Sequence, residues 1–479
     1  MKKILSLKYA ILFLILGLGI FFYPFFTSGF DKLAGTYIDS RYITYLLEHF
    51  WLWLHQTAPH QSLWNVPMYY PSTNTLATSD CLFVLGLIYV PLRFLFDSYN
   101  SFMLTVIALC TLNFVSFYYL LRKYFKFNDL ACAFGSFIFA FCLFRQEQLM
   151  HVQIFSQCLS VFAVIFFLKS KEKALFAYIG TLFLALQLYT SFYLGWLFFF
   201  AVGLTAIIFL GFKDYRTQLF SFIKNYYKII LSNLVFFAIL IAPLAYHYLQ
   251  NEVLKFPFEV VKMFQTSFLN GILNNSFLDN HIFFKLENFS ENTYYGLGIF
   301  TTIFLIYGLI KLKTYRRYCI AVILCVLAIM NFIFIEKIIY DYVIGGGAIR
   351  ALVRYFNILI PMFAIISAYT IQNLNKNIVK WLIIILIVVE QISVFPLFDW
   401  TKTGAEKIIN SYDVPKTCNV IFIYYSKIPT SSNIELDKYE VDGMWVALRN
   451  KIYTVHGYGA SMQPRTQTKL QPECILELK

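Results

Sequence analysis

Residues 8–27 read KYAILFLILGLGIFFYPFFT, an apolar run long enough to cross a bilayer as a helix. The basic start at Lys2 and Lys3 followed by this run is similar to a secretory signal peptide, but no small-residue cleavage site follows it. We therefore expect residues 8–27 to be retained as the first of several membrane spans.

The composition of the chain indicates a polytopic membrane protein. Of 479 residues, 59% are hydrophobic and 14% are charged, whereas soluble proteins carry about 25% charged residues. The mean hydropathy is +0.64. The net charge of +13 does not indicate a nucleic-acid partner, because the basic residues are scattered over short loops between apolar runs.

Apolar runs of span length predict about eleven transmembrane helices. They are residues 8–27, 100–121, 130–146, 151–168, 174–190, 191–211, 229–248, 294–311, 317–335, 352–371 and 379–396. The apolar run Cys81–Phe96 is short and contains Pro91 and Arg93, so we expect an interfacial or re-entrant helix there.

The distribution of charge predicts the orientation. If the N-terminus is cytoplasmic, the loops on its side of the membrane carry nineteen basic residues and three acids. Such an excess is typical of the cytoplasmic face. We therefore expect a transmembrane domain over residues 1–396, with two long outside loops at residues 28–99 and 249–293, and an extracytoplasmic tail.

The tail, residues 397–479, has a composition of its own. Asn419–Tyr425 predicts a buried strand, Lys438–Arg449 a helix, and Ile452–Val455 and Cys474–Leu478 two further strands. We expect a small α/β domain. Cys418 and Cys474 both lie in it, on the oxidising side of the membrane if the protein is periplasmic, and either a disulfide or two free thiols is compatible with the sequence.

The first outside loop contains two acids near apolar surroundings, a costly placement that usually marks a functional cavity. Asp39 begins a segment, Tyr37–Leu54, whose apolar spacing predicts an amphipathic helix at the outer interface. Asp39 is either a functional carboxylate or a helix cap. Asp80 ends an ordered stretch, residues 64–80, rich in proline, aromatic and polar residues.

These motifs resemble the GT-C superfamily of membrane glycosyltransferases, specifically a bacterial branch. The resemblance rests on the Asp-x-Arg motif at residues 39–41 and on the segment from Tyr70-Pro71 to Asp80. It continues in further segments over nearly the whole chain: 145–153, 189–195, 349–356, Asp442-Gly443-Met444-Trp445 and His456-Gly457-Tyr458-Gly459. In the last of these, relatives tend to have Asn where this chain has His456. The resemblance implies an integral protein of the bacterial inner membrane.

The resemblance also implies a reaction. GT-C enzymes transfer a sugar from a polyprenyl-phosphate carrier to an acceptor outside the membrane, which can be a glycan, a lipid or a protein. Asp39 matches the general base of these enzymes, and Arg41 would hold it ionised or contact the donor. Asp80 would position the acceptor or, with Asp39, bind a divalent cation such as Mg²⁺ or Mn²⁺.

The leaving phosphate needs cationic partners, and Arg350 and Arg354 are the candidates. Their spacing predicts one helical face at the start of a span, and guanidinium groups bind phosphate through two parallel hydrogen bonds. The alternative is that both side chains reach lipid headgroups. The preceding Gly345-Gly346-Gly347 predicts a bend or a close backbone approach.

Weaker candidates lie at other outward turns. His151, close to Arg145 and Glu147, either binds a sugar or donor phosphate or is a local structural partner. Tyr193 either supports a sugar or belongs, with Tyr189, to the interfacial aromatic belt. Glu390 lies in a predicted span and should face the bundle or its outer end.

Two other classes of function remain open. A transporter or flippase for a lipid-linked sugar would also have many spans and a polar cavity, but the chain lacks two halves with matching broken helices. A scaffold of envelope assembly is the second alternative. An enzyme requires Asp39 near an open groove and the arginines, whereas a transporter requires charges at mid-bilayer on several helices.

Overall fold

The computed structural model describes residues 7–250, 255–271, 275–283, 292–394, 397–425, 433–458 and 472–478. Among these residues, seven helices are long and apolar enough to span a membrane, or eight if one bent pair is counted as a span. The class predicted from the sequence, a helical membrane protein, agrees with this. The prediction of eleven spans stays a prediction, because several helices at the predicted positions are shorter than a span.

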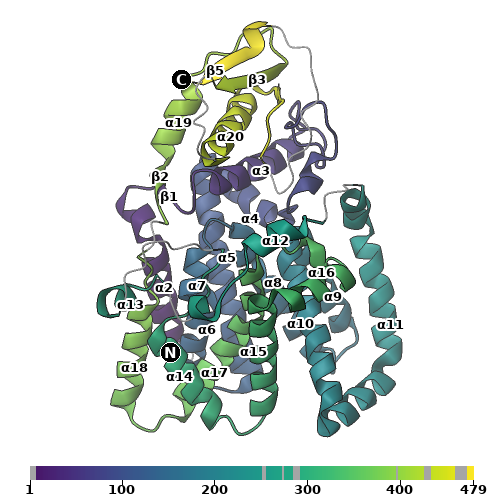
Figure 1. Cartoon of the computed structure of the whole chain (residues 1–479), viewed down its shortest axis with the longest axis vertical. Coiled ribbons are helices and arrows are strands. Elements are labelled where there is room, and N and C mark those ends of the chain that lie inside the picture. Colours follow the sequence, from purple (N-terminus) through teal and green to yellow (C-terminus); the bar gives the residue numbers. More distant parts are fainter. Residues whose placement is uncertain are drawn as a thin grey trace.

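The helices run roughly side by side below a smaller unit formed by the tail (Figure 1). The helices in and beside the bundle are α2 (Lys8–Thr27), α3 (Asp39–Leu54), α4 (Phe83–Arg93), α5 (Ser98–Leu120), α6 (Asp129–Phe141), α7 (Leu143–Glu147), α8 (Cys158–Lys169), α9 (Leu175–Thr190), α10 (Phe192–Gly211), α11 (Lys213–Leu249), α12 (Phe258–Met263), α13 (Phe277–Ile282), α14 (Ile299–Lys311), α15 (Arg316–Asn331), α16 (Ile333–Tyr342), α17 (Leu359–Asn373) and α18 (Asn377–Glu390). The tail contains α19 (Lys402–Asn410) and α20 (Asn433–Asn450).

Two helices differ from the predicted spans. The span expected at 229–248 is the second half of α11, a continuous helix of 37 residues. At about 1.5 Å per residue such a helix is much longer than the roughly 30 Å hydrocarbon layer. The span expected at 317–335 ends at Asn331, because α15 and α16 meet at an angle of 92°.

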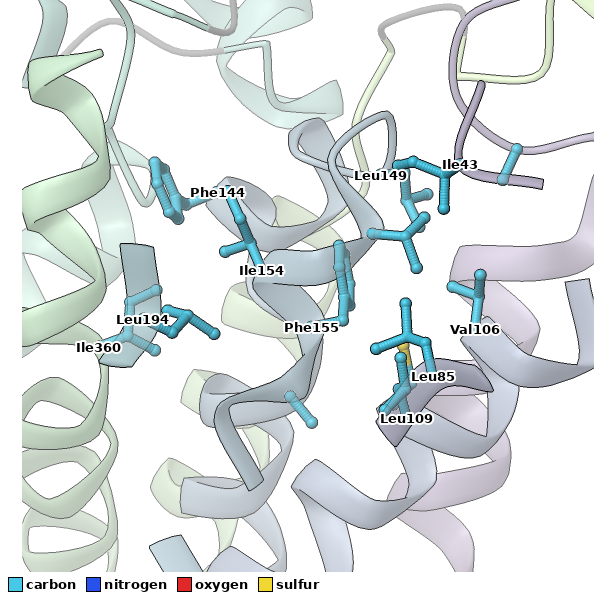
Figure 2. Close-up of a cluster of buried hydrophobic side chains, with 14 of the residues drawn as sticks. Ile43, Leu85, Val106, Leu109, Phe144, Leu149, Ile154, Phe155, Leu194 and Ile360 are labelled. Atoms are coloured by element: carbon cyan, nitrogen blue, oxygen red, sulfur yellow. The ribbon is translucent and has the colours of Figure 1, made fainter. Parts of the chain in front are cut away.

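The core of the bundle is centred on α6, whose residues from Ala131 to Phe141 are all buried. This helix packs against α2, α5 and α17. Nearer the tail, the broken segment between α7 and α8 turns inward. There Leu149, Ile154 and Phe155 join a cluster of apolar side chains from α3, α4 and α5 (Figure 2). The bundle therefore supports the loops above it with a continuous apolar base.

Helix α3 forms where the sequence predicts it, but it is more enclosed than an interfacial helix. Residues Ser40 to Phe50 are buried on every side, because the tail covers the face of α3 that points away from the bundle (Figure 1). The amphipathic pattern predicted one buried face. Coverage by a segment 400 residues later in the chain could not be predicted from that pattern.

In the tail, strands form at the predicted positions. Strands β3 (Val420–Tyr425), β4 (Tyr453–Thr454) and β5 (Ile475–Leu478) make a parallel sheet in the order β4-β3-β5, and α20 packs against β3. Cys418 and Cys474 form a disulfide that ties the start of β3 to β5. Gly459 and residues 460–471 lie outside the described residues.

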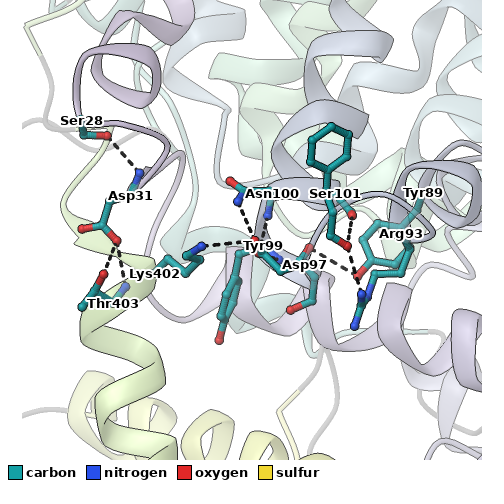
Figure 3. Close-up of polar contacts among 12 residues, drawn as sticks. Ser28, Asp31, Tyr89, Arg93, Asp97, Tyr99, Asn100, Ser101, Lys402 and Thr403 are labelled. Carbon is teal, nitrogen blue, oxygen red and sulfur yellow. Dashed lines mark hydrogen bonds and ion pairs between the residues drawn. The ribbon is translucent and has the colours of Figure 1, made fainter.

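The tail is fastened to the first long loop, residues 28–99, by backbone and polar contacts. Strand β1 (Lys32–Leu33) pairs with β2 (Trp400–Thr401) in antiparallel fashion. Beside them, Asp31 accepts hydrogen bonds from the amide and hydroxyl of Thr403, and Lys402 pairs with Asp97 at 3.2 Å (Figure 3). Residues 67–70 exchange further backbone bonds with residues 454–456.

A buried ion pair reinforces this attachment. The Arg41 guanidinium on α3 pairs with Asp442 on α20, and Arg41 is 0% exposed. The Tyr37 hydroxyl donates to the same carboxylate at 2.8 Å, and the Trp445 indole N–H donates to the Arg41 carbonyl at 3.1 Å. The first loop and the tail are thus joined through charges that water cannot reach.

Removing one member of this pair should destabilise the protein strongly. Asp442→Ala leaves Arg41 buried without its counter-charge, so we expect a loss of about 3–5 kcal/mol. The matched control is Asp341→Ala, which breaks the exposed Lys337–Asp341 pair and should cost under about 1 kcal/mol. Thermal unfolding of the detergent-solubilised variants measures both, and equal losses would contradict the assignment of Arg41 and Asp442 as the principal fastening.

Candidate functional site

A cavity of about 370 Å³ lies where the first loop, the tail and the top of the bundle meet. Residues from several helices and loops line it. They include Asp39, Asp80, Arg350 and Arg354, the two acids and two arginines predicted from the sequence. The lining residues are Asp39, Tyr42, Ile43, Ala77, Thr78, Ser79, Asp80, Leu82, His151, Gln153, Phe192, Tyr193, Tyr248, Phe256, Ala348, Arg350, Arg354, Asp437 and Tyr458. Residues that are more than 400 positions apart therefore share one site.

Asp39 is the first residue of α3, and its carboxylate is turned to the cavity. One oxygen accepts a hydrogen bond from the Tyr458 hydroxyl at 2.9 Å, and the other accepts one from the Thr36 hydroxyl at 3.2 Å. The helix-cap interpretation of Asp39 is wrong, because its carboxylate caps no helix amide. The Asp39 amide itself donates to the Thr36 hydroxyl at 3.1 Å.

The surroundings of Asp39 have opposing effects on its charge. Burial raises the pKa of the Asp39 carboxyl above its usual value, while the bonds from Tyr458 and Thr36 and the charges of Arg354 and Arg350 lower it. A carboxylate with a raised pKa is a stronger proton acceptor than a free one, provided that nearby cations keep it ionised. This combination suits a general base.

Arg350 and Arg354 reach the cavity, but not by the predicted helical face. Ile349 and Ala351 on either side of Arg350 are extended, and Arg354 lies in a 3-10 helix, Leu352–Ile358. The prediction that Arg350 and Arg354 share one face of an α-helix is therefore wrong. Before this stretch the chain turns at Gly345, which has φ +78° and lies against Trp196, where a side chain would clash.

The two guanidinium groups are held by aromatic rings and lack counter-charges. Arg354 is 4% exposed and lies 4.1 Å from the ring centre of Tyr193. Arg350 lies near the rings of Phe256 and Phe264, at 5.2 and 5.5 Å. In the described part of the chain, neither group forms an ion pair, and the buried Nε of each has no hydrogen-bond partner. A buried and a half-buried guanidinium, neither of which has an ion-pair partner, favour an anionic ligand.

Besides lining the cavity, Asp80 forms a hydrogen bond that is not predicted from the sequence. Its carboxylate accepts a hydrogen bond from the Phe192 amide at 2.7 Å, at the start of α10. Burial raises the pKa of Asp80 to about 6, against the lowering effects of that amide, Arg354 and Gln153. Asp80 therefore both fixes the N-terminus of α10 and lines the cavity.

The surroundings of His151 disfavour its protonated form. It lies in the turn between α7 and the 3-10 helix Val152–Gln157, and burial together with the charges of Arg354 and Arg350 lowers the pKa of its imidazole well below the usual value. A neutral imidazole beside two arginines can donate or accept a hydrogen bond without adding charge.

Other candidates lie away from the cavity. Arg41 is paired with Asp442, as described above. Arg145 is fully buried and donates to the carbonyls of Phe139 and Ile154 and to the Gln157 side chain, so it clamps the turn that carries His151. Glu390 is buried at the end of α18, as predicted for an acid in a span, and accepts the Phe300 and Thr301 amides at 2.7 Å. Its contacts cap α14.

A divalent cation would have few protein ligands here. No group of three or more His, Cys, Asp and Glu residues that could hold a metal ion is found among the described residues. Asp39 and Asp80 would have to share such an ion with oxygens of a substrate. Divalent cations bound by one or two carboxylates and substrate phosphates follow this pattern.

Several lining residues are not predicted from the sequence. Asp437 and Tyr458 come from the tail, and Phe256 comes from the second long loop, residues 249–293. Tyr458 belongs to the tail motif but was not assigned a role, and nothing in the sequence around Asp437 distinguishes it from other acids on helix surfaces. No family model matches the chain, and no curated protein matches it.

Replacing Asp80 should change stability in a pH-dependent way. Because burial raises its pKa to about 6 from an unfolded value near 3.8, its ionisation destabilises the folded chain as pH rises through 6. Asp80→Asn keeps an acceptor for the Phe192 amide but cannot ionise. We expect it to melt a few degrees above the wild type at pH 8 and to lose this gain at pH 4.

Asp413→Asn, at an exposed acid of the tail, is the matched control and should shift melting at neither pH. A stabilisation of Asp80→Asn that is the same at both pH values would show that the charge of Asp80 is not its cause.

Proposed function

We propose that this protein is a membrane glycosyltransferase that moves a sugar from a polyprenyl-phosphate carrier to an acceptor outside the cytoplasm. The observation that carries the proposal is the shared cavity, in which Asp39 faces two arginines without counter-charges. A base and an anion site in one cavity are the two elements that sugar transfer from a phosphate carrier requires.

In this reaction Asp39 accepts the proton of an acceptor hydroxyl. The acceptor oxygen forms a bond to the anomeric carbon of the donor, and the bond between that carbon and the carrier phosphate breaks. The departing phosphate takes the electron pair, and Arg350 and Arg354 stabilise its charge. Each Asp39 oxygen has a second lone pair, so the bonds from Tyr458 and Thr36 leave capacity for the acceptor proton.

The remaining sequence predictions belong to the same proposal. The chain would have a GT-C-like fold with eleven spans in the bacterial inner membrane, a cytoplasmic N-terminus and an extracytoplasmic α/β domain at 397–479. This orientation is supported by the charge distribution of the loops. It would place the cavity on the outer side, where a carrier lipid presents its sugar and where membrane lipids surround the bundle.

The assay is release of carrier phosphate. Purified protein is incubated with a panel of synthetic undecaprenyl-phosphate sugars and a soluble acceptor mixture, and free undecaprenyl phosphate is quantified by mass spectrometry. A transporter or flippase moves a lipid-linked sugar without breaking this bond. Transport into vesicles with an intact carrier–sugar bond would therefore replace the enzyme proposal with the transporter alternative.

The role of Asp39 as base predicts a large loss in one variant. Asp39→Asn keeps the shape of the side chain and an oxygen for the Tyr458 hydroxyl, but an amide cannot accept a proton at neutral pH. We expect carrier release to fall about 10²–10⁴-fold with melting temperature little changed. Near-normal release by Asp39→Asn would overturn the assignment, and Asp341→Asn serves as a control, because Asp341 pairs with Lys337 and does not line the cavity.

Binding of the carrier phosphate should depend on the planar shape of the guanidinium groups as well as on their charge. Arg354→Lys and Arg350→Lys retain a positive charge but lose the planar pair of donors. We expect each to weaken binding of undecaprenyl phosphate roughly tenfold, a loss of about 1.4 kcal/mol, as measured by ligand-induced thermal stabilisation.

The control for both variants is Arg316→Lys, at the exposed arginine that begins α15. If all three variants bind undecaprenyl phosphate as the wild type does, the two cavity arginines do not bind the carrier phosphate.

A further inference from the structure

Asp437 is a third acid in the cavity, and it comes from a different part of the chain than the other two. It lies on α20, faces the same space as Asp39 and is partly buried. In the described part of the chain its carboxylate has no hydrogen bond and no ion pair. The neighbouring Lys438 points elsewhere, with its ammonium 6.0 Å from the ring of Tyr37.

The half-buried carboxylate of Asp437 has free capacity to accept hydrogen bonds from a ligand. A carboxylate can accept about four hydrogen bonds, and burial and the charge of Asp39 both raise the pKa of Asp437. The charges of the arginines lower the pKa of Asp39 and Asp80. No such effect of an arginine acts on Asp437 within the described part of the chain. A ligand that displaces water from Asp437 would have to bring hydrogen-bond donors of its own.

Aromatic rings stand beside the acid pair. Tyr458, which donates to Asp39, packs edge to face against Tyr42 at 5.2 Å between ring centres, and both rings line the cavity. A pyranose ring carries hydroxyl donors at its edge and C–H groups on its face. Carboxylates can accept hydrogen bonds from the edge, and aromatic rings can pack against the face. A site that combines apolar walls with few placed polar groups is typical of small-ligand recognition.

A separate observation indicates that the cavity accepts a ligand. Arg354 is 4% exposed and lines the same cavity, yet its guanidinium has no hydrogen-bond or ionic partner among the described residues. A buried cation without a partner is costly unless a ligand supplies the anion. The arginines therefore line the part of the cavity that suits the phosphate of the sugar donor. The acids from α3 and α20 line a part that suits a ligand rich in hydrogen-bond donors.

We infer that the acceptor is a polyhydroxylated carbohydrate, and that Asp437 binds a pair of its hydroxyl groups while Asp39 faces the reacting one. This inference rests on the proposed function and assigns the tail a direct role in choosing the acceptor. A carbohydrate offers neighbouring hydroxyls to both carboxylates, whereas a lipid acceptor with a single hydroxyl would leave Asp437 without donors.

The test measures sugar binding without any donor. The full-length protein in nanodiscs is examined by saturation-transfer difference NMR with methyl glycosides of glucose, galactose, mannose and N-acetylglucosamine, with undecaprenyl phosphate added to fill the arginine side. We expect a saturation-transfer signal for at least one glycoside. Asp437→Ala should reduce it to the level of empty nanodiscs, and Asp437→Asn, which keeps one acceptor oxygen, should retain part of it.

Asp413→Asn, at the exposed acid in the tail, is the control and should bind as the wild type does. Stabilisation of each variant by undecaprenyl phosphate establishes that the cavity is intact. Loss of glycoside signal in Asp437→Ala with this stabilisation preserved supports the inference.

Absence of a signal for every glycoside with the wild type would overturn the carbohydrate assignment, as would an equal signal with Asp437→Ala. Saturation transfer to ethanolamine but to no glycoside would also overturn it, in favour of a cationic acceptor. These results are distinct from a failure of the proposed function, which would appear as an absence of carrier release in the transfer assay.

Discussion

The buried ion pair between Arg41 and Asp442 is the interaction on which the arrangement of the site depends. It joins α3, which carries Asp39, to α20, which carries Asp437, and it does so where water cannot screen the charges. Breaking such a pair is expensive because the remaining charge stays buried. The pair therefore holds the loop acid and the tail acid at the same cavity.

The Asp-x-Arg motif thus has two separate tasks. Asp39 and Arg41 are two residues apart near the start of α3, so their side chains point in different directions around the helix. Arg41 points to Asp442 and fastens the tail, whereas Asp39 points to the cavity. From the resemblance, Arg41 was expected to contact the sugar donor or to keep Asp39 ionised. The arginines whose charges act on Asp39 are Arg350 and Arg354 instead.

The cavity keeps unlike charges near each other without pairing them. Arg350 and Arg354 are held against aromatic rings, and Asp39 is held by two hydroxyls. If carboxylate and guanidinium were paired directly, the base would be neutralised and the anion site occupied. Neutral hydroxyl donors and ring faces position these groups while their charges stay available to a ligand.

The sequence by itself determined the class of the protein, the positions of most helices and the strand pattern of the tail, because apolar runs and alternation are local properties. It also selected Asp39, Asp80, Arg350 and Arg354, since charges in an apolar chain are conspicuous. Only the tertiary structure decided which of these meet. The extended path that brings both arginines to one cavity, the burial of α3 by the tail and the arrival of Asp437 and Tyr458 depend on contacts between residues hundreds of positions apart, which leave no periodic signal in the chain.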